Sequence, residues 1–242
     1  SYATPKLSAA NPTRKFPVNA ARQVVRDLGM LASVPALLRV ALGGAFFWTL
    51  ASVSNMNIDA FGTGELGLEQ QQIGLLLGVL TVAVGAGNLL AALLSRGRIE
   101  LGLVPLGAAG MAVGSMMLFT AADSYAATCL WLVVVGVCGG MFDVPQQAYL
   151  QQHSPRASRG SIMAASNFLT FGGMLLASGV YWVLRTPLGL EARDVFLAAG
   201  AATVPVAAYA LWVTQRQTVQ LLVGLVGRAM YRVDVAGVEH VT

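Results

Sequence analysis

Six long apolar runs dominate this sequence, and their length restricts what the chain can form. They cover approximately residues 35–57, 73–94, 101–121, 126–147, 162–184 and 195–213. A helix needs about 20 apolar residues to cross the hydrocarbon core of a bilayer. The runs are continuous instead of alternating between apolar and polar residues, which indicates helices and not the strands of a barrel. The sequence therefore predicts an all-α membrane protein with six transmembrane helices.

The charged residues are too few to cover the surface of a soluble protein. They make up 11% of the sequence, whereas a typical soluble domain carries about 25%. The formal net charge is +4, but the basic residues lie between the apolar runs instead of forming one patch. No nucleic-acid-binding motif accompanies them. We therefore expect membrane lipids as partners, and no nucleic acid.

The basic residues lie almost entirely on one side of the predicted membrane. All but two of the 15 Lys and Arg residues fall before the first run, after the second, after the fourth or after the sixth, or at the very start of the first. The two exceptions are Arg185 and Arg193, on the side where most acidic residues gather. Because cytoplasmic loops are enriched in Lys and Arg, we expect a multi-pass protein with both termini in the cytoplasm.

The runs divide the chain into three parts. Residues 1–34 form a basic cytoplasmic linker, in which 20–31 form either a short surface helix or part of a disordered segment. Residues 35–214 form the transmembrane bundle. In residues 215–242, an amphipathic stretch at 218–231 is typical of a helix at the membrane interface, and the alternating pattern that follows is typical of a strand. We interpret that last pattern as the start of a truncated soluble domain, and the chain as a fragment of a longer polypeptide.

Asp143 is the only acid well inside an apolar run. A charged residue at the centre of a membrane costs at least ~2.5 kcal/mol on insertion scales, so its presence needs a reason. One reason is a functional site that faces a polar cavity. The alternative is a helix N-cap, because Pro145 breaks regular helices and an Asp just before it caps the helix that restarts.

Other polar residues recur at helical spacing and therefore share helix faces. The stripes are Trp48, Ser52, Asn55 and Asp59; Thr81, Gly85 and Asn88; and Asn167, Thr170 and Met174. They either line one aqueous cavity or form contacts between helices, as the pairs Gly136/Gly140 and Gly110/Gly114 are expected to do. Our candidates for the cavity lining are Trp48, Asn55, Asn88, Asp143 and Asn167.

Signals of catalysis are weak. His153 lies in a basic turn and His240 near the end of the sequence, so neither lies within a run beside a serine nucleophile. Cys129 and Cys138 are nine helical residues apart, roughly 13 Å, too far for a disulfide. Neither a Cys/His metal cluster nor a nucleotide-binding loop is present. We expect no enzyme activity, no cofactor and no metal.

The six spans, the basic linker and the short basic turn after the second span together resemble half of a major facilitator transporter. That turn, residues 94–100, is similar to the family's acid-Arg-x-Gly-Arg loop, although Ser95 replaces the acid and one spacer residue is missing. The resemblance implies a three-plus-three inverted repeat and a missing amino-terminal half around a central cavity. It also implies a role at the cytoplasmic gate, or on anionic lipid headgroups, for Arg96, Arg98, Arg156 and Arg159.

Three segments, residues 95–107, 142–155 and 164–179, look like the carboxy-terminal half of bacterial lysophospholipid transporters. This resemblance implies lysophospholipid translocation across the bacterial inner membrane and a possible fused glycerophospholipid acyltransferase. The acyltransferase's His-x4-Asp motif is absent, since Ser158 stands fifth after His153 and the sequence ends after His240. Two alternatives stay open: a major facilitator transporter of a drug, sugar or metabolite, and a non-transporting membrane anchor for the fused enzyme.

Overall fold

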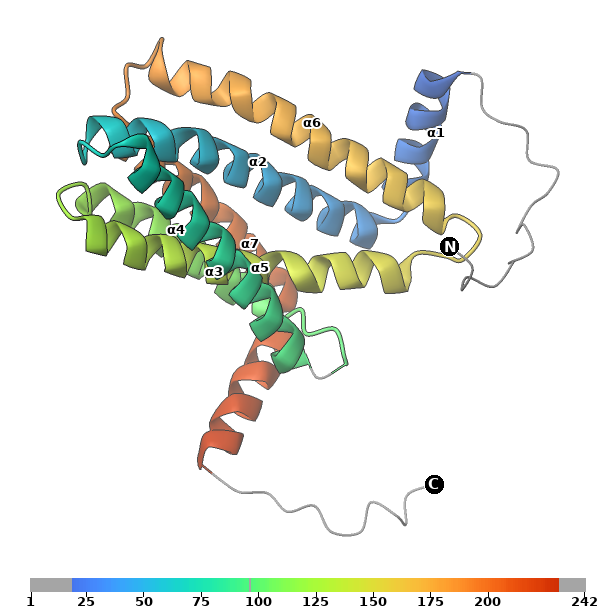
Figure 1. Ribbon diagram of the computed structural model, residues 1–242. Coiled ribbons are helices and arrows are strands. Elements are labelled where there is room, and N and C mark those ends of the chain that lie inside the picture. Colours follow the sequence, from blue (N-terminus) through green and yellow to red (C-terminus); the bar gives the residue numbers. More distant parts are fainter. Residues whose placement is uncertain (1–18, 96, 231–242) are drawn as a thin grey trace, which may run out of the picture.

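A computed structural model describes residues 19–95 and 97–230, which form seven α-helices and no strand (Figure 1). The helices are α1 (Ala20–Ala32), α2 (Pro35–Gly64), α3 (Gln70–Ser95), α4 (Leu103–Thr120), α5 (Tyr125–His153), α6 (Arg159–Arg185) and α7 (Ala192–Met230). Six of them, α2 to α7, are long and apolar enough to cross a membrane. The predicted all-α, multi-pass membrane fold is confirmed. The predicted strand-like end falls at residues 231–242, outside the described residues.

The helices extend beyond most of the apolar runs that predict them. The run at 35–57 becomes a helix that continues to Gly64, where the Thr63 hydroxyl donates to the Asp59 carbonyl at 2.9 Å. Polar side chains of this kind continue a helix without adding to the apolar pattern. The connections that follow α2 and α6 contain Gly67 and Gly189, each with φ of 61°, a conformation that favours glycine. Hydropathy therefore marks the membrane-crossing part of each helix, and not its hydrogen-bonded limits.

The packing of the helices shows two repeats of three. The extensively packed pairs are α4 with α7, α3 with α5, α4 with α5, and α2 with α6, and α2 also contacts α5 and α7. Exchanging α2, α3 and α4 for α5, α6 and α7 turns the α3–α5 pair into the α6–α2 pair, and the α4–α5 pair into the α7–α2 pair. The α4–α7 and α2–α5 pairs map onto themselves. This is the pattern expected of a three-plus-three repeat, and Figure 1 shows α2 and α6 side by side along much of their length.

Glycines allow α3 and α5 to approach backbone to backbone. A Cβ atom added at Gly140 would lie 2.5 Å from the Asn88 nitrogen, and one at Gly136 would lie 2.9 Å from the Leu80 carbonyl oxygen. In return, a Cβ added at Gly87 of α3 would overlap the Val137 carbonyl. The predicted close contact at Gly136 and Gly140 is confirmed, and it fixes how α3 and α5 face each other.

Helix α5 is continuous through Pro145. The alternative interpretation of Asp143, as the N-cap of a helix restarted at this proline, is therefore wrong. Next to the proline, the Gln146 Nε2 donates to the Phe142 carbonyl of its own helix at 2.8 Å. Pro145 has no N–H to donate to the Met141 carbonyl, and membrane helices tolerate prolines of this kind.

Helix α7 bends at Thr214, whose φ of −112° and ψ of 19° are not helical. The Thr214 hydroxyl donates to the Ala210 carbonyl at 2.8 Å, and the Thr218 hydroxyl donates to the Thr214 carbonyl at 2.9 Å. Such back-bonding often bends helices. After the bend, Leu221 is buried with Ala91 of α3 and Leu103 of α4. The stretch predicted as an amphipathic interfacial helix therefore continues α7, and its first part packs on the bundle.

The sequence left residues 20–31 as either a short surface helix or part of a disordered segment, and the structure shows a helix there. Asn19 caps α1, since its side chain accepts a hydrogen bond from the Arg22 backbone nitrogen at 3.0 Å. Leu28 and Leu31 pack into a cluster with α2, α5 and α6, whereas Val25 is 70% exposed. The bundle thus covers only some of the apolar side chains of α1.

Candidate functional site: a polar cavity between α2, α3 and α5

A cavity of about 240 Å³ lies between α2, α3 and α5. Its polar lining comes from each of the three helices, and its remaining wall is apolar. The polar lining residues are Trp48, Ser54, Asn55, Thr81, Asn88 and Asp143. Four of the five residues proposed from the sequence to line a cavity, namely Trp48, Asn55, Asn88 and Asp143, therefore share one site.

Helical spacing places these residues in the cavity. Trp48, Ala51 and Asn55 follow one another at three- and four-residue intervals along α2, and so point to the same side. Thr81 and Asn88 are seven residues apart on α3, about two helical turns, and also point to one side. On α5 the corresponding positions leading to Asp143 are the glycines 136 and 139, which have no side chain to fill the space. The cavity therefore has polar groups on all three helices, and part of its α5 wall, at Gly136 and Gly139, is bare backbone.

Asp143 carries the only ionisable side chain in this lining. It is half-buried, and the Gln147 amide donates to its Oδ1 at 3.4 Å, a long contact. The amide of Asn55 donates to the Ala51 carbonyl at 3.0 Å, which leaves its Oδ1 for another partner. The cavity thus offers a carboxylate, two amides and two hydroxyls, and these groups can bind a cation, a proton or the hydroxyl groups of a substrate.

Asn167 lies elsewhere. It is exposed on α6 and does not line the cavity. Helix α6 contacts α2 at Gly173, where an added Cβ would lie 3.0 Å from the Ala45 carbonyl oxygen. At about 100° per residue, Asn167 points roughly a third of a turn away from that contact. The stripe of Asn167, Thr170 and Met174 is thus separate from the other two.

The basic candidates lie at the opposite end of the helices from most of the acids. Arg156, in the turn before α6, and Arg159, the first residue of α6, are exposed. Arg98 lies with Ser95 and Glu100 in a separate polar hollow near α7. Arg96 is outside the described residues. We call this the arginine-rich end. None of the three described arginines lines the cavity.

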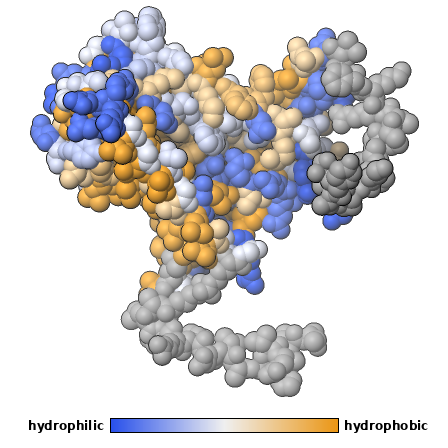
Figure 2. Space-filling model, viewed as in Figure 1, coloured by the Kyte–Doolittle hydropathy of each residue, from blue (hydrophilic) through white to orange (hydrophobic). Residues whose placement is uncertain are grey.

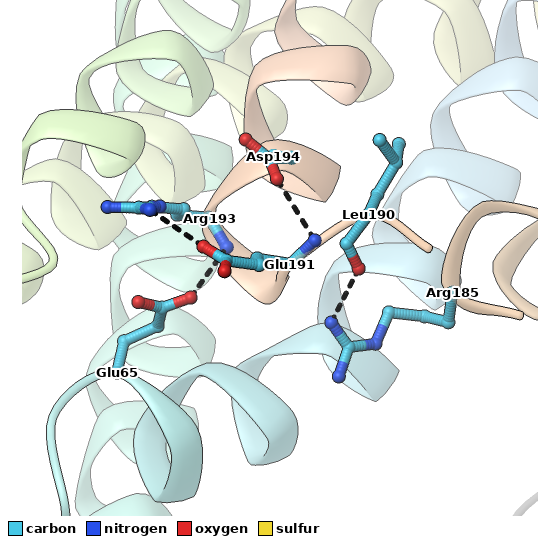
Figure 3. Close-up of polar contacts among 6 residues, drawn as sticks. All are labelled: Glu65, Arg185, Leu190, Glu191, Arg193 and Asp194. Carbon is cyan, nitrogen blue, oxygen red and sulfur yellow. Dashed lines mark hydrogen bonds and ion pairs between the residues drawn. The ribbon is translucent and has the colours of Figure 1, made fainter. Parts of the chain in front are cut away.

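A polar cluster lies at the other, acidic end of the helices and connects three of them (Figure 3). The sequence interpretation missed this cluster. The Arg193 guanidinium pairs with Glu191 at 2.7 Å, and the Arg193 backbone nitrogen donates to Glu65 at the end of α2 at 3.4 Å. Arg185, at the end of α6, donates to the Leu190 carbonyl at 2.7 Å. The contacts connect the ends of α2 and α6 to the start of α7. The one available sequence signal is that Arg185 and Arg193 are the two arginines among the acids.

Residues 3–178 match the Major Facilitator Superfamily. The chain belongs to this superfamily. The match covers most of the chain and agrees with the six membrane-length helices and their three-plus-three packing. The Major Facilitator Superfamily is a family of membrane transporters, so the match supports transport as the activity of this protein. Comparison with curated proteins and with solved structures gave no match.

Proposed function

We propose that this major facilitator chain forms half of a lysophospholipid transporter, which moves its substrate across the bacterial inner membrane by alternating access. The observation that carries the proposal is the convergence of Trp48, Asn55, Asn88 and Asp143 on one cavity in otherwise apolar helices. Polar side chains inside a membrane are costly and mark substrate or ion pathways. An amino-terminal half packed against this one would close the cavity and open it alternately to the two sides.

The lining of the cavity favours an amphiphile over a fully polar substrate. Leu50, Leu80, Val84 and Val135 lie in the same wall as the amides and the carboxylate. The first part of one acyl chain fits the apolar part, while the glycerol hydroxyl of a lysophospholipid fits the amides and the carboxylate of the polar part. A sugar would leave the apolar part without a partner, and an alkane-like substrate would leave the amides and Asp143 without one.

The remaining parts of the proposal concern orientation and partners. The arginine-rich end faces the cytoplasm, where Arg98, Arg156 and Arg159, together with Arg96, bind anionic headgroups or act at the gate. An acyltransferase fused to the transporter would acylate the lipid delivered on that side. A sugar or drug transporter, and a membrane anchor without transport, are the competing functions.

The test is lysophospholipid translocation by the full-length protein in proteoliposomes. We expect Asp143→Asn to lower the rate about tenfold or more, as loss of a charge-assisted contact does, with unchanged insertion and yield. Asn167→Ala is the matched control, since it removes an exposed polar side chain outside the cavity, and we expect the wild-type rate. An Asp143→Asn rate equal to wild type rejects the role of Asp143. Wild-type protein that transports sugars or drugs but no lysophospholipid rejects the substrate, and vesicles without any transport favour the anchor.

A further inference from the structure

A second cavity, of about 160 Å³, lies on the other side of α5 from the polar cavity between α2, α3 and α5, which we call the substrate cavity. It is lined by α2, α4, α5 and α7, and it opens near the arginine-rich end. Phe142 and Gln146 of α5 face this second cavity, whereas Gly139 and Asp143 face the substrate cavity. The two cavities share no lining residue, so a ligand in one leaves the other free.

The bend of α7 creates the space. Before the bend, Val206 and Ala210 pack with Phe142 and Val104 of the neighbouring helices. Beyond Thr214, α7 lies close against the start of α4, where a Cβ added at Gly102 would be 2.7 Å from the Gln217 carbonyl oxygen. The departure of α7 toward α4 leaves a wedge beside the first turns of α2, and this wedge is the second cavity.

The second cavity has an apolar floor and a cationic mouth. Val104 and Phe142 in the floor are 7% and 1% exposed. Arg39 is exposed at the mouth and is the only charged residue of the lining, and Tyr209, also in the lining, is 48% exposed. Within residues 19–95 and 97–230, Arg39 has no ion pair. A guanidinium in this position fits the oxygens of a phosphate or carboxylate, which it binds through two parallel hydrogen bonds.

The size of the second cavity restricts the ligand. Its volume of about 160 Å³ is below the roughly 300–1,000 Å³ of sites that enclose a drug-sized molecule. It therefore takes only the first part of one acyl chain. The rest of the chain lies along the membrane-facing side of α7, where Val213 of the lining is 41% exposed.

We propose that this second cavity binds a single-chain anionic lipid, with the headgroup on Arg39 and the chain on the floor formed by Val104 and Phe142. The site is separate from the transported substrate and does not depend on what the substrate cavity carries. A bound chain would also fill the wedge between α2 and the bend of α7.

Native mass spectrometry of the full-length protein in a neutral detergent tests the proposal, with dodecyl phosphate as the probe and monolaurin as its neutral counterpart. We expect one dodecyl phosphate to bind at least about tenfold more tightly than monolaurin, the usual value of a charge-assisted hydrogen bond. Arg39→Gln should remove this preference. Arg26→Gln, which neutralises an exposed arginine of α1 outside the cavity, should retain it.

Two space-filling variants separate the cavities. Ala210→Trp fills the second cavity and should abolish binding of the probe, whereas Ala51→Trp fills the substrate cavity and should leave it unchanged. The proposal fails if dodecyl phosphate binds no better than monolaurin, if Arg39→Gln binds like wild type, or if Ala51→Trp and not Ala210→Trp abolishes binding. If Arg39→Gln does not fold, the wild-type comparison of the two probes and the two tryptophan variants decide.

Discussion

Asn57 is the residue whose side chain is most completely enclosed among the polar groups of α2. It has 0% exposure, and its Nδ2 donates to the Ala192 carbonyl at the start of α7 at 2.8 Å. Its Oδ1 is buried without a partner among the residues that the structure describes. This amide therefore connects two helices that are 135 residues apart in the sequence, at the end of the bundle opposite the arginines.

We predict that Asn57→Ala lowers the free energy of unfolding by about 1 kcal/mol, the net value of one buried hydrogen bond. The loss is limited because the variant also removes the unpartnered Oδ1. Thermal unfolding of the purified protein in detergent measures the effect. Asn55→Ala is the control, because Asn55 is exposed and its amide bonds only to its own helix. Equal stability of the two variants would contradict a connecting role for Asn57.

The candidate site shows how far the direction of a side chain follows from the spacing in its own helix, and how far it depends on contacts between helices. Trp48 and Asn55 share a face of α2 because of helical spacing alone, and this was sufficient to place them together. Asn167 has the same kind of stripe, but its direction depends on how α6 meets α2 at Gly173. That contact is between distant parts of the chain and leaves no periodic signal in the sequence around Asn167.

At the scale of helices, the contact between α3 and α5 supports one wall of the substrate cavity. Asn88 lies in the lining, and its backbone nitrogen is the nearest atom to a Cβ added at Gly140, at 2.5 Å. The atoms around Gly140 are mostly backbone, so they have little freedom to move away. A side chain here must separate the helices and displace Asn88 from the cavity.

Gly140→Ala should therefore destabilise the protein by about 1–3 kcal/mol, the usual cost of overpacking, and reduce transport. Gly85→Ala is the matched control on α3, since an added Cβ there meets no atom within 4 Å. Replacement of glycine by alanine inside a helix otherwise stabilises it, by up to about 1 kcal/mol. Melting temperatures in detergent should thus fall for Gly140→Ala and stay level or rise for Gly85→Ala. A fall of the same size in both variants would show that the close contact at Gly140 is not what lowers the stability.

The number of membrane helices was predictable, because each apolar run has the length of a crossing. The continuity of α5 was not, since Pro145 breaks most helices and the packing of α5 against α3 and α4 becomes visible only in three dimensions. The bend of α7 was not predictable for a similar reason. Thr214 and Thr218 are ordinary residues in the sequence, and their bonds to the backbone produce a bend that lets Leu221 pack on α3 and α4.

The whole molecule presents three zones along its helices. Arginines lie at one end, a polar cluster of acids with Arg185 and Arg193 lies at the other, and apolar side chains are exposed between them. Phe171 and Leu175 on α6 are 67% and 77% exposed, and Val82 on α3 is 73% exposed. On the face of the molecule that Figure 2 shows, large hydrophobic areas are interrupted by a hydrophilic area near the middle. Lipid, or another apolar protein surface, is the surrounding that these apolar side chains require.

With six crossings, an even number, both ends of the bundle lie on one side of the membrane, and the charge distribution predicts that this side is the cytoplasm. Single cysteines test the prediction in a full-length variant with Cys129 and Cys138 replaced. Glu69→Cys lies in the connection between α2 and α3, and Ala157→Cys lies beside Arg156 and Arg159; both positions are exposed. Applied to spheroplasts, a membrane-impermeant maleimide should label Glu69→Cys directly and Ala157→Cys only after lysis. Labelling of Ala157→Cys in intact spheroplasts, with Glu69→Cys protected, would invert the topology and would place the Arg39 mouth of the second cavity on the outer side of the membrane.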